Sequence, residues 1–325
     1  MLTHPQRRWQ ISKGSGVHQW IKQLENPKPE ETDIIIYGAP LSRSAISASG
    51  ASQYPNAFRK GWQGFQSYNL DEQIDLRSLS VADIGNVTMH PTDVLLSQVA
   101  IEEASEFVAK TYPKSYSCLI GGDHSITACA VRGVKKAFPN HKIGIIQLDT
   151  HLDVRNHEEV ALTDESPIRQ LIEAGVVEGK HIYNIGLHGF FNAPEIIQFA
   201  RDQGIHMITL KQMRRDGVST TIREVLRQLM YDVDRIYVTV DMDVLDITFA
   251  QGVPASTPGG MTVYELFDIL KLLGENEGVR HIDFVCLDPQ RDTLAQATVK
   301  TGITTFLQWL TGIQLERKYR NFSRS

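Results

Sequence analysis

Six side chains of the types that bind divalent metal ions lie in three short clusters of the sequence. They are His124, Asp149, His151, Asp153, Asp241 and Asp243. Each cluster follows an apolar run, such as 143–148 or 236–240, that is typical of a buried parallel strand. In open parallel sheets, ligands bind beyond the carboxyl ends of the strands. Together the clusters predict a two-metal hydrolytic site at that edge of a sheet.

The spacing within the clusters places these side chains on one face of the chain. In an extended segment, residues at i, i+2 and i+4 point the same way. Asp149, His151 and Asp153 therefore project together, and Asp241 projects with Asp243. Carboxylates gathered without a counter-cation repel one another and lose hydration, and a divalent cation removes that cost.

Two further acidic residues near the clusters have a structural interpretation. An Asp directly after a strand most often caps a helix or forms a turn. We expect Asp123, which precedes His124, to form a turn or to support a ligand from behind. We expect Asp246, which is out of phase with Asp241 and Asp243, to cap the loop that follows.

The predicted ligand set indicates the kind of chemistry. It is rich in oxygen, with two imidazoles and no sulfur, which suits Mn²⁺ and similar ions better than a structural zinc site. Two such ions, about 3.5–4 Å apart, can hold a hydroxide between them at neutral pH. That hydroxide can attack the trigonal carbon of a carbonyl, an amidine or a guanidine, and a nearby carboxylate can carry its proton to the leaving amine. The residues alone therefore predict metal-assisted hydrolysis of a C–N or related bond.

Strands alternate with amphipathic helices along the chain from Asp33 onward. The expected strands are 34–37, 81–84, 118–120, 143–148, 182–186, 206–208, 236–240 and 282–287. The expected helices are 92–110, 125–138, 166–174, 194–203, 219–231, 262–274 and 295–310. This alternation predicts an α/β fold, a three-layer α/β/α sandwich around a mostly parallel sheet of about eight strands. We expect an N-terminal arm over residues 1–32 and a single catalytic domain over 33–325.

The composition is that of an ordinary globular protein. The 325 residues are 42% hydrophobic and 22% charged with a net charge of −5, and no basic tract favours nucleic acid. No apolar run is long enough to span a bilayer, and the first residues lack the apolar core of a secretory signal. The cysteines Cys118, Cys129 and Cys286 are too widely spaced to indicate a disulfide framework. We therefore expect a cytoplasmic enzyme that acts on a small molecule, without nucleic acid or membrane partners.

Three motifs resemble those of the ureohydrolase superfamily, which comprises arginases, agmatinases and formimidoylglutamases. They are Gly-Gly-Asp-His-Ser at 121–125, Asp-Thr-His-Leu-Asp at 149–153 and Val-Asp-Met-Asp-Val-Leu-Asp at 240–246. The family usually has Ala where Thr150 stands. The resemblance implies an arginase-like fold, two Mn²⁺ per chain, and a homo-oligomer that is a trimer or a hexamer.

The resemblance also implies a role for each predicted ligand. One Mn²⁺ would be held by His124, Asp149, Asp153 and Asp241. The other would be held by Asp149, His151, Asp241 and Asp243, so that Asp149 and Asp241 bridge the two ions. Asp153 would be the catalytic residue that hydrogen-bonds the bridging hydroxide and shuttles its proton.

Within the superfamily the flanking residues most resemble formimidoylglutamases. The run from Asp153 to Asn156 is similar to the Asp-x-Arg of that branch, which implies that Arg155 and Asn156 bind substrate. A guanidinium suits bidentate binding of a glutamate carboxylate, although a surface or inter-subunit salt bridge is an equal alternative for Arg155. The segment 186–192, with His188 and Asn192, resembles the segment that lines the substrate pocket.

One position departs from the family pattern. Where the family has Glu in Asp-Ile-Val-Glu-x-x-Pro, this chain has Cys286. The family's Glu pairs with the cationic amidine or guanidinium of the substrate. A cysteine supplies that charge only when ionised, and a buried cysteine is more often a neutral packing residue. Cys286 is nevertheless placed with the candidate substrate-binding residues.

Three functions are compatible with this sequence. The first is an Mn²⁺-dependent formimidoylglutamase of histidine degradation, which uses a metal-bridging hydroxide to convert N-formimidoyl-L-glutamate to L-glutamate and formamide. The second is another ureohydrolase, similar to agmatinases, arginases or guanidino-acid hydrolases, whose specificity is changed by Cys286. The third is a metal-binding relative with low activity and a regulatory role.

Overall fold

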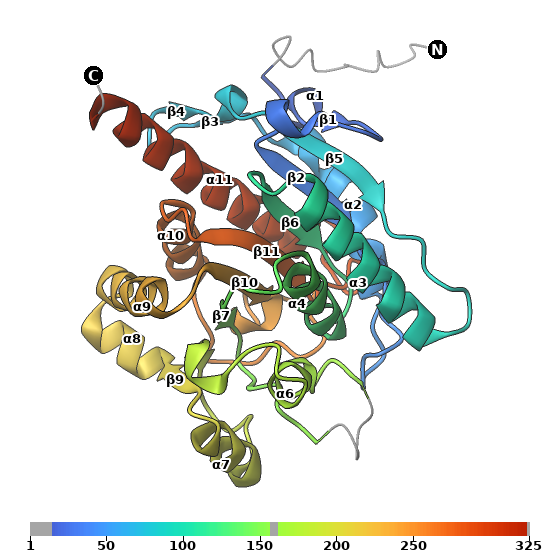
Figure 1. Ribbon diagram of the computed structural model, residues 1–325, viewed down its shortest axis with the longest axis vertical. Coiled ribbons are helices and arrows are strands. Elements are labelled where there is room, and N and C mark those ends of the chain that lie inside the picture. The colour runs from blue at the N-terminus through green and yellow to red at the C-terminus, as the bar shows by residue number, and fades with distance from the viewer. Residues whose placement is uncertain (1–14, 157–161, 324–325) are drawn as a thin grey trace, which may run out of the picture.

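A computed structural model describes residues 15–156 and 162–323 (Figure 1). Its main sheet has nine strands in the order β1-β5-β2-β6-β11-β10-β7-β8-β9, and every neighbouring pair is parallel. The strands are β1 (Lys22–Gln23), β2 (Ile34–Gly38), β5 (Val81–Asn86), β6 (Tyr116–Ile120), β7 (Ile143–Leu148), β8 (Ile182–Leu187), β9 (His206–Thr209), β10 (Arg235–Asp241) and β11 (Val279–Val285). The predicted α/β/α sandwich is confirmed, with nine strands rather than about eight.

Helices cover both faces of this sheet. On one face lie α3 (Val94–Thr111), α4 (Ser125–Ala137), α6 (Pro167–Glu173) and α7 (Pro194–Asp202). On the other lie α1 (Val17–Trp20), α2 (Tyr54–Gly61), α8 (Leu210–Asp216), α9 (Val218–Asp232), α10 (Val263–Gly274) and α11 (Ala297–Ser323). Each layer buries its own hydrophobic core against the sheet. Central strands such as β7 are buried at every position, which explains why they are apolar without alternation.

The ninth strand comes from the segment predicted as an N-terminal arm. The two residues of β1 pair with β5 in parallel, with Lys22 opposite Ala82. Val17 and Trp20 of the preceding α1 are buried in the core. A four-residue helix and a two-residue strand are too short for hydrophobic periodicity to indicate them. Residues 1–14 of the predicted arm lie outside the described residues, and the boundary at residue 33 stays a prediction.

The other differences from the predicted elements are local. Helices α2 and α8 and the antiparallel hairpin of β3 (Tyr68–Asn69) and β4 (Ile74–Asp75) were not predicted. Helix α11 continues well beyond the predicted end at residue 310. Strand β11 ends at Val285 rather than 287, because Cys286 adopts a left-handed backbone with φ of 67°.

No helix within residues 15–156 and 162–323 is both long and apolar enough to cross a membrane.

Candidate metal centre

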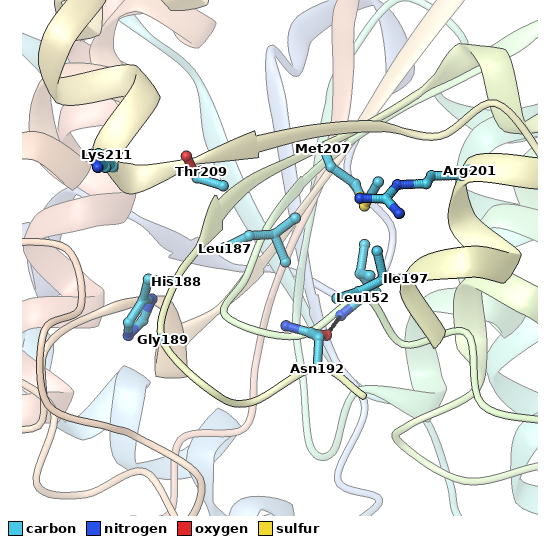
Figure 2. A pocket seen from close by; sticks show the side chains of 10 residues that line it. All are labelled: Leu152, Leu187, His188, Gly189, Asn192, Ile197, Arg201, Met207, Thr209 and Lys211. Atoms are coloured by element: carbon cyan, nitrogen blue, oxygen red, sulfur yellow. Dashed lines mark hydrogen bonds between the residues drawn. The ribbon is translucent and has the colours of Figure 1, made fainter. Parts of the chain in front are cut away.

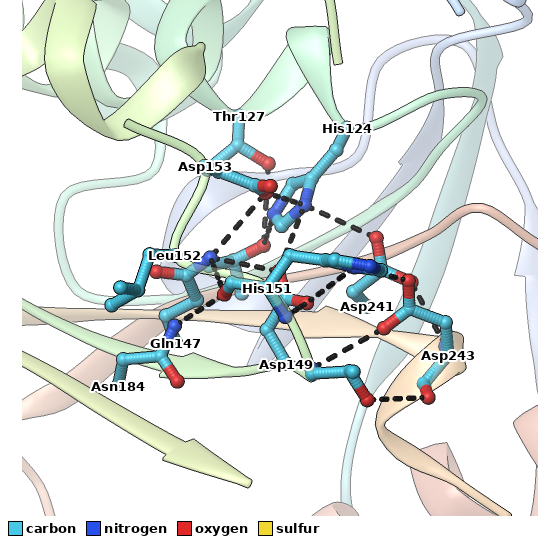
Figure 3. Close-up of polar contacts among 12 residues, drawn as sticks. His124, Thr127, Gln147, Asp149, His151, Leu152, Asp153, Asn184, Asp241 and Asp243 are labelled. Carbon is cyan, nitrogen blue, oxygen red and sulfur yellow. Dashed lines mark hydrogen bonds and ion pairs between the residues drawn. The ribbon is translucent and has the colours of Figure 1, made fainter. Parts of the chain in front are cut away.

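The predicted metal ligands lie at the carboxyl ends of strands that are neighbours in the sheet. In the strand order, β6, β11, β10 and β7 follow one another. His124 follows β6 at the start of α4, while Asp149, His151 and Asp153 follow β7. Asp241 ends β10, and Asp243 lies in the short 3₁₀ turn after it. Segments far apart in the sequence therefore bring all six side chains together (Figure 3).

The first group of ligands surrounds the imidazole of His124. Its Nδ1 lies 2.7 Å from Oδ2 of Asp153, 3.1 Å from Oδ2 of Asp241 and 3.3 Å from Oδ2 of Asp149. All four side chains are almost completely buried. This is the set that the resemblance assigns to one ion.

The second group surrounds the imidazole of His151. Its Nδ1 lies 2.9 Å from Oδ2 of Asp243 and 3.5 Å from Oδ1 of Asp149. Asp149 therefore directs one carboxylate oxygen toward each group, as a bridging ligand would. Asp241 instead uses Oδ1 to accept the backbone N–H of Asp243, so its second bridge stays a prediction. The His151 side chain is 29% exposed, and solvent reaches the centre on this side.

The protonation equilibria of the cluster show its need for positive charge. Burial alone would lower the pKa of His124 and of His151, but the neighbouring carboxylates raise both, Asp153 acting mainly on His124 and Asp243 on His151. Burial and the charge of Asp149 raise the pKa of Asp153 well above its usual range. Burial and the charge of Asp241 do the same for Asp243. The acids therefore compete for positive charge, which protons supply when no metal is bound.

The residues present fit a pair of divalent ions. Three buried carboxylates converge on Nδ1 of His124, yet none forms a hydrogen bond of acceptable geometry with it within the described residues. An imidazole nitrogen facing several carboxylate oxygens is the donor set of an ion such as Mn²⁺. The arrangement can therefore hold metal and activate water beside it.

A chain of hydroxyl groups orients the His124 ring from behind. Nε2 of His124 lies 2.9 Å from Oγ1 of Thr239, which lies 3.2 Å from Oγ1 of Thr127. Thr127 donates to Oδ2 of the buried Asp283 at 2.8 Å. Because the carboxylate accepts, donation runs from Nε2–H toward Asp283 and leaves the lone pair of Nδ1 facing the acids.

Amide and hydroxyl groups hold the other ligand segment in place. Nε2 of Gln147 donates to Oδ2 of Asp149 at 2.7 Å, and Nδ2 of Asn184 donates to the carbonyl of His151 at 2.6 Å. Thr150, where the family usually has Ala, donates to the carbonyl of Asp243 at 3.0 Å and so ties the two ligand segments together. The sequence analysis missed these supports. The available signal was a polar residue inside an otherwise apolar strand, as with Gln147 in β7 and Asn184 in β8.

Backbone geometry also shapes the turns at the centre. Gly122 passes so close to Leu41 that a Cβ would lie 1.6 Å from the Leu41 carbonyl oxygen, so only glycine fits before His124. Asp153 has a left-handed backbone with φ of 52°. Such conformations are uncommon for residues other than glycine and occur often at functional sites.

Both acidic residues with a structural interpretation form turns. Asp123 accepts the backbone N–H of Ser125 at 3.1 Å and that of Ser44 at 3.0 Å. Asp246 accepts the backbone N–H of Thr248 at 2.9 Å. Each carboxylate therefore stabilises a backbone turn beside the ligand cluster.

Two of the predicted substrate-binding residues, Arg155 and Asn156, lie outside the ligand cluster. Arg155 forms an ion pair with Glu165, so the salt-bridge alternative is realised within the chain. Arg155 and Asn156 line a cavity of about 230 Å³ beside Arg169 and Glu195. The structure therefore does not bring their side chains into the ligand cluster.

His188 and Asn192 line a second cavity, of about 500 Å³, together with Leu152 (Figure 2). Both ends of the Asn192 amide are occupied, because Oδ1 accepts from the N–H of Leu152 and Nδ2 donates to the carbonyl of Thr150. The ring of His188 contacts the Gly186 carbonyl and Oγ1 of Thr257. In this structure Asn192 positions the backbone that carries His151.

Cys286, by contrast, lies at the ligand cluster. Its sulfur, His124 and Asp241 offer ligand atoms within 4.8 Å of one another. Burial and the charges of Asp241 and Asp164 raise the pKa of its thiol well above the usual range.

Asp164 is a further acidic residue near the centre that was not among the predicted site residues. Burial, with the charge of Asp123, raises its pKa to about 7. Oδ1 of Asp164 accepts the backbone N–H of Ile46 at 3.1 Å. The charge of Asp164 raises the pKa of Cys286, and the charge of Asp241 raises the pKa of Asp164, so this carboxyl group lies within electrostatic range of the centre.

Fold and site together define a ureohydrolase. Residues 32–311 match the Arginase family, and the chain belongs to that family. It is 38% identical to a formimidoylglutamase of Halalkalibacterium halodurans over 279 residues. This aligned region covers 85% of this chain and 86% of the relative. The protein is therefore a hydrolase of the ureohydrolase type.

Solved structures extend this similarity to three dimensions. The crystal structure of formimidoylglutamase from Bacillus subtilis matches with a TM-score of 0.90 at 28% identity, over 97% of both chains. Formiminoglutamase from Trypanosoma cruzi, crystallised with Mn²⁺, matches with a TM-score of 0.81 over 89% of this chain and 96% of that one. At 24% identity, this second likeness concerns the fold.

Proposed function

We propose that the protein is an Mn²⁺-dependent formimidoylglutamase that hydrolyses N-formimidoyl-L-glutamate to L-glutamate and formamide. The observation that carries the proposal is the position of Asp149, whose two carboxylate oxygens face the separate imidazole groups of His124 and His151. The similarity to a formimidoylglutamase at 38% identity supports the choice of substrate. A cytoplasmic location and a trimeric or hexameric assembly are part of the same proposal.

In this proposal the ligand cluster holds two Mn²⁺ ions. His124, Asp149, Asp153 and Asp241 would hold one, and Asp149, His151, Asp241 and Asp243 the other. When bound, the ions supply a nucleophilic water at neutral pH.

Asp153 would orient that water and carry its proton to the leaving nitrogen of glutamate. Its Oδ2 faces Nδ1 of His124, and its left-handed backbone fixes that direction. The reaction forms a C–O bond at the formimidoyl carbon and breaks the C–N bond to glutamate. Thr239 would keep the His124 ring turned toward the cluster throughout.

The cationic formimidoyl group needs a negative partner because Cys286 replaces the family's Glu. We assign this role to Asp164, whose charge acts on Cys286 and which itself feels the charge of the ligand Asp241. Among the described residues, Asp164 has no cationic partner in an ion pair. Arg155 would bind the carboxylate end of the substrate only by exchanging its contact with Glu165 for the substrate.

The proposal is tested with a substrate panel. Mn²⁺-loaded protein is offered formimidoylglutamate, arginine, agmatine, guanidinobutyrate and guanidine, and formamide, urea and ammonia are measured. We expect the highest kcat/KM for formimidoylglutamate, with formamide as product, and a matched Asp153→Asn variant to lose turnover. A higher kcat/KM for a guanidino compound, with urea as product, would instead establish the ureohydrolase of altered specificity. No turnover of any compound by fully loaded protein would favour the regulatory relative.

A further inference from the structure

Cys286 lies at the end of β11, beside the ligand cluster. Cys286 follows Val285, the last residue of the strand, and its φ of 67° takes it out of the extended backbone. Its backbone N–H donates to the carbonyl of Gly122 at 2.8 Å. That contact joins Cys286 to the turn that carries His124. The backbone of Cys286 is therefore held by both the end of β11 and the turn before His124.

The sulfur of Cys286 has the spacing of a metal ligand. It lies with a ring nitrogen of His124 and a carboxylate oxygen of Asp241 in a group whose members are all within 4.8 Å of one another. Metal–sulfur and metal–nitrogen bonds of about 2.3 and 2.1 Å place two ligands of one ion at most about 4.4 Å apart. The three ligand atoms therefore lie close to the spacing that one coordination sphere requires.

A second observation points to a ligand at this place. Nδ1 of His124 is buried, and within the described residues it forms no hydrogen bond of acceptable geometry. Asp153, Asp149 and Asp241 surround this nitrogen, so a cation is the group that satisfies all of these atoms together. Cys286 completes the ring of donors on the β11 side.

We propose that Sγ of Cys286 is an additional ligand of the metal ion bound by His124, Asp149, Asp153 and Asp241. This inference rests on the binuclear centre of the proposed function. It makes the two metal sites chemically different, because the His151 site keeps only nitrogen and oxygen donors. Thiolate is a soft ligand, and it favours ions such as Co²⁺ and Zn²⁺ over Mn²⁺. The His124 site is therefore the site that prefers thiophilic ions.

Cobalt provides a test that does not depend on turnover. Full-length protein is freed of metal and titrated with Co²⁺, while bound cobalt is counted and the absorption spectrum is recorded. We expect two Co²⁺ per chain and a near-ultraviolet charge-transfer band from sulfur to cobalt that grows with one of them. The Cys286→Ser variant should still bind Co²⁺ but lack the band. The matched control Cys118→Ala removes a buried cysteine of β6 outside the cluster and should keep it.

Competition between Co²⁺ and Mn²⁺ for the protein tests the metal contact of Cys286 independently of the absorption spectrum. The preference for Co²⁺ over Mn²⁺ should fall on the order of tenfold or more in Cys286→Ser, a change comparable with the loss of a supporting metal contact. Two bound Co²⁺ with no charge-transfer band in the wild-type protein would overturn the inference and leave the binuclear centre intact. Failure to bind Co²⁺ or Mn²⁺ at all would overturn both this inference and the proposed function.

Discussion

The hydroxyl of Thr239 supports the predicted metal ligand His124 directly. It contacts Nε2 of His124 at 2.9 Å and lies at the start of the chain that ends on Asp283. Replacing it with valine keeps the shape of the side chain but removes this contact. We expect Thr239→Val to weaken Mn²⁺ binding about tenfold to hundredfold, as is usual for residues that orient a ligand. Metal titration of the variant measures the change.

Thr239→Ser is the matched control for this experiment. It keeps the hydroxyl and loses one methyl group, so its Mn²⁺ affinity should stay close to that of the wild-type protein. Equal affinities for the valine variant and the wild type would show that the hydroxyl chain does not orient His124.

Asp164 carries a prediction about pH. Its pKa of about 7 means that the carboxylate form predominates only above that pH. If Asp164 pairs with the cationic substrate, KM for formimidoylglutamate should rise as the pH falls below 7, because the protonated acid has lost the charge. In Asp164→Asn, KM should exceed the wild-type value above pH 7, approach it below pH 7, and lose this part of the pH dependence. The KM of wild type and variant is measured from pH 6 to 8.5, and an unchanged KM in the variant would remove Asp164 from the substrate site.

At the scale of residues, the ligands could be identified from sequence but several neighbours could not. Alternate spacing places Asp149, His151 and Asp153 on one side of the chain wherever an extended segment occurs. The roles of Thr239 and Asp164 depend on strand neighbours or on loops that meet only in the folded chain. Asn192 has a backbone contact that its sequence position did not indicate, because its amide holds Thr150 and Leu152 while the residue lines the cavity. Its role in substrate binding stays a prediction.

Strands β6 and β11 carry a buried polar pair that makes stability depend on pH. Nδ1 of His281 lies 2.8 Å from Oγ of Ser117. Burial, together with the charges of Arg235 and Arg280, lowers the pKa of His281 to about 3. Unfolded chains take up this proton near pH 6.5, whereas the folded chain does so only near pH 3. The contribution of His281 to the unfolding free energy should therefore be complete above pH 6.5 and decrease as the pH is lowered toward 3.

The size of this effect follows from the linkage between protonation and folding. Between pH 6.5 and 5, His281 should account for a loss of roughly 1.5 kcal/mol in unfolding free energy. Urea denaturation gives the unfolding free energy of the metal-free wild type and of His281→Asn at each pH. The difference between these two pH profiles measures the loss that His281 causes. The asparagine variant should show the shallower slope, and parallel profiles would contradict the assignment.

At the scale of elements, long periodic segments were predicted well and short ones were not. The expected strand 143–148 matches β7, because a short uninterrupted apolar run indicates a buried parallel strand, and the expected helix 125–138 differs from α4 by one residue, because it spans enough turns to reveal its period. Helix α1 and strand β1 are too short for such a signal. The end of β11 was missed because Cys286 leaves the strand in a conformation that its residue type does not indicate.

The whole molecule should be stabilised by the metal it binds. A ligand that binds only the folded chain at about one hundred times its Kd adds about 2.7 kcal/mol to the unfolding free energy. For a chain of this length that corresponds to a rise in Tm of about 4 °C. Removing metal with a chelator should lower Tm by this amount, and added Mn²⁺ should restore it.

The control for metal-linked stability is a variant that has lost a shared ligand. Asp241→Ala should fold, because the sheet core does not depend on this side chain, but its Tm should not respond to Mn²⁺. A Tm of the wild-type protein that is the same with and without metal would contradict a metal centre buried in the fold.

Architecture was the most predictable property of the molecule. Alternation of strands and helices restricts the chain to a parallel sheet covered on both faces, and this is what the structure has. The order of the strands was not predicted, because neighbouring strands such as β6 and β11 are far apart in the sequence and pair through the tertiary fold. That order is what brings His124 and Cys286 to one place.

The most direct test of this account is the rate of formamide release from formimidoylglutamate, measured against the number of Mn²⁺ ions added per metal-free chain. The account predicts that the rate depends on metal, rises up to two equivalents and is constant beyond them. A rate that is independent of metal, or that reaches its maximum at one equivalent, would contradict a binuclear Mn²⁺ centre as the site of hydrolysis.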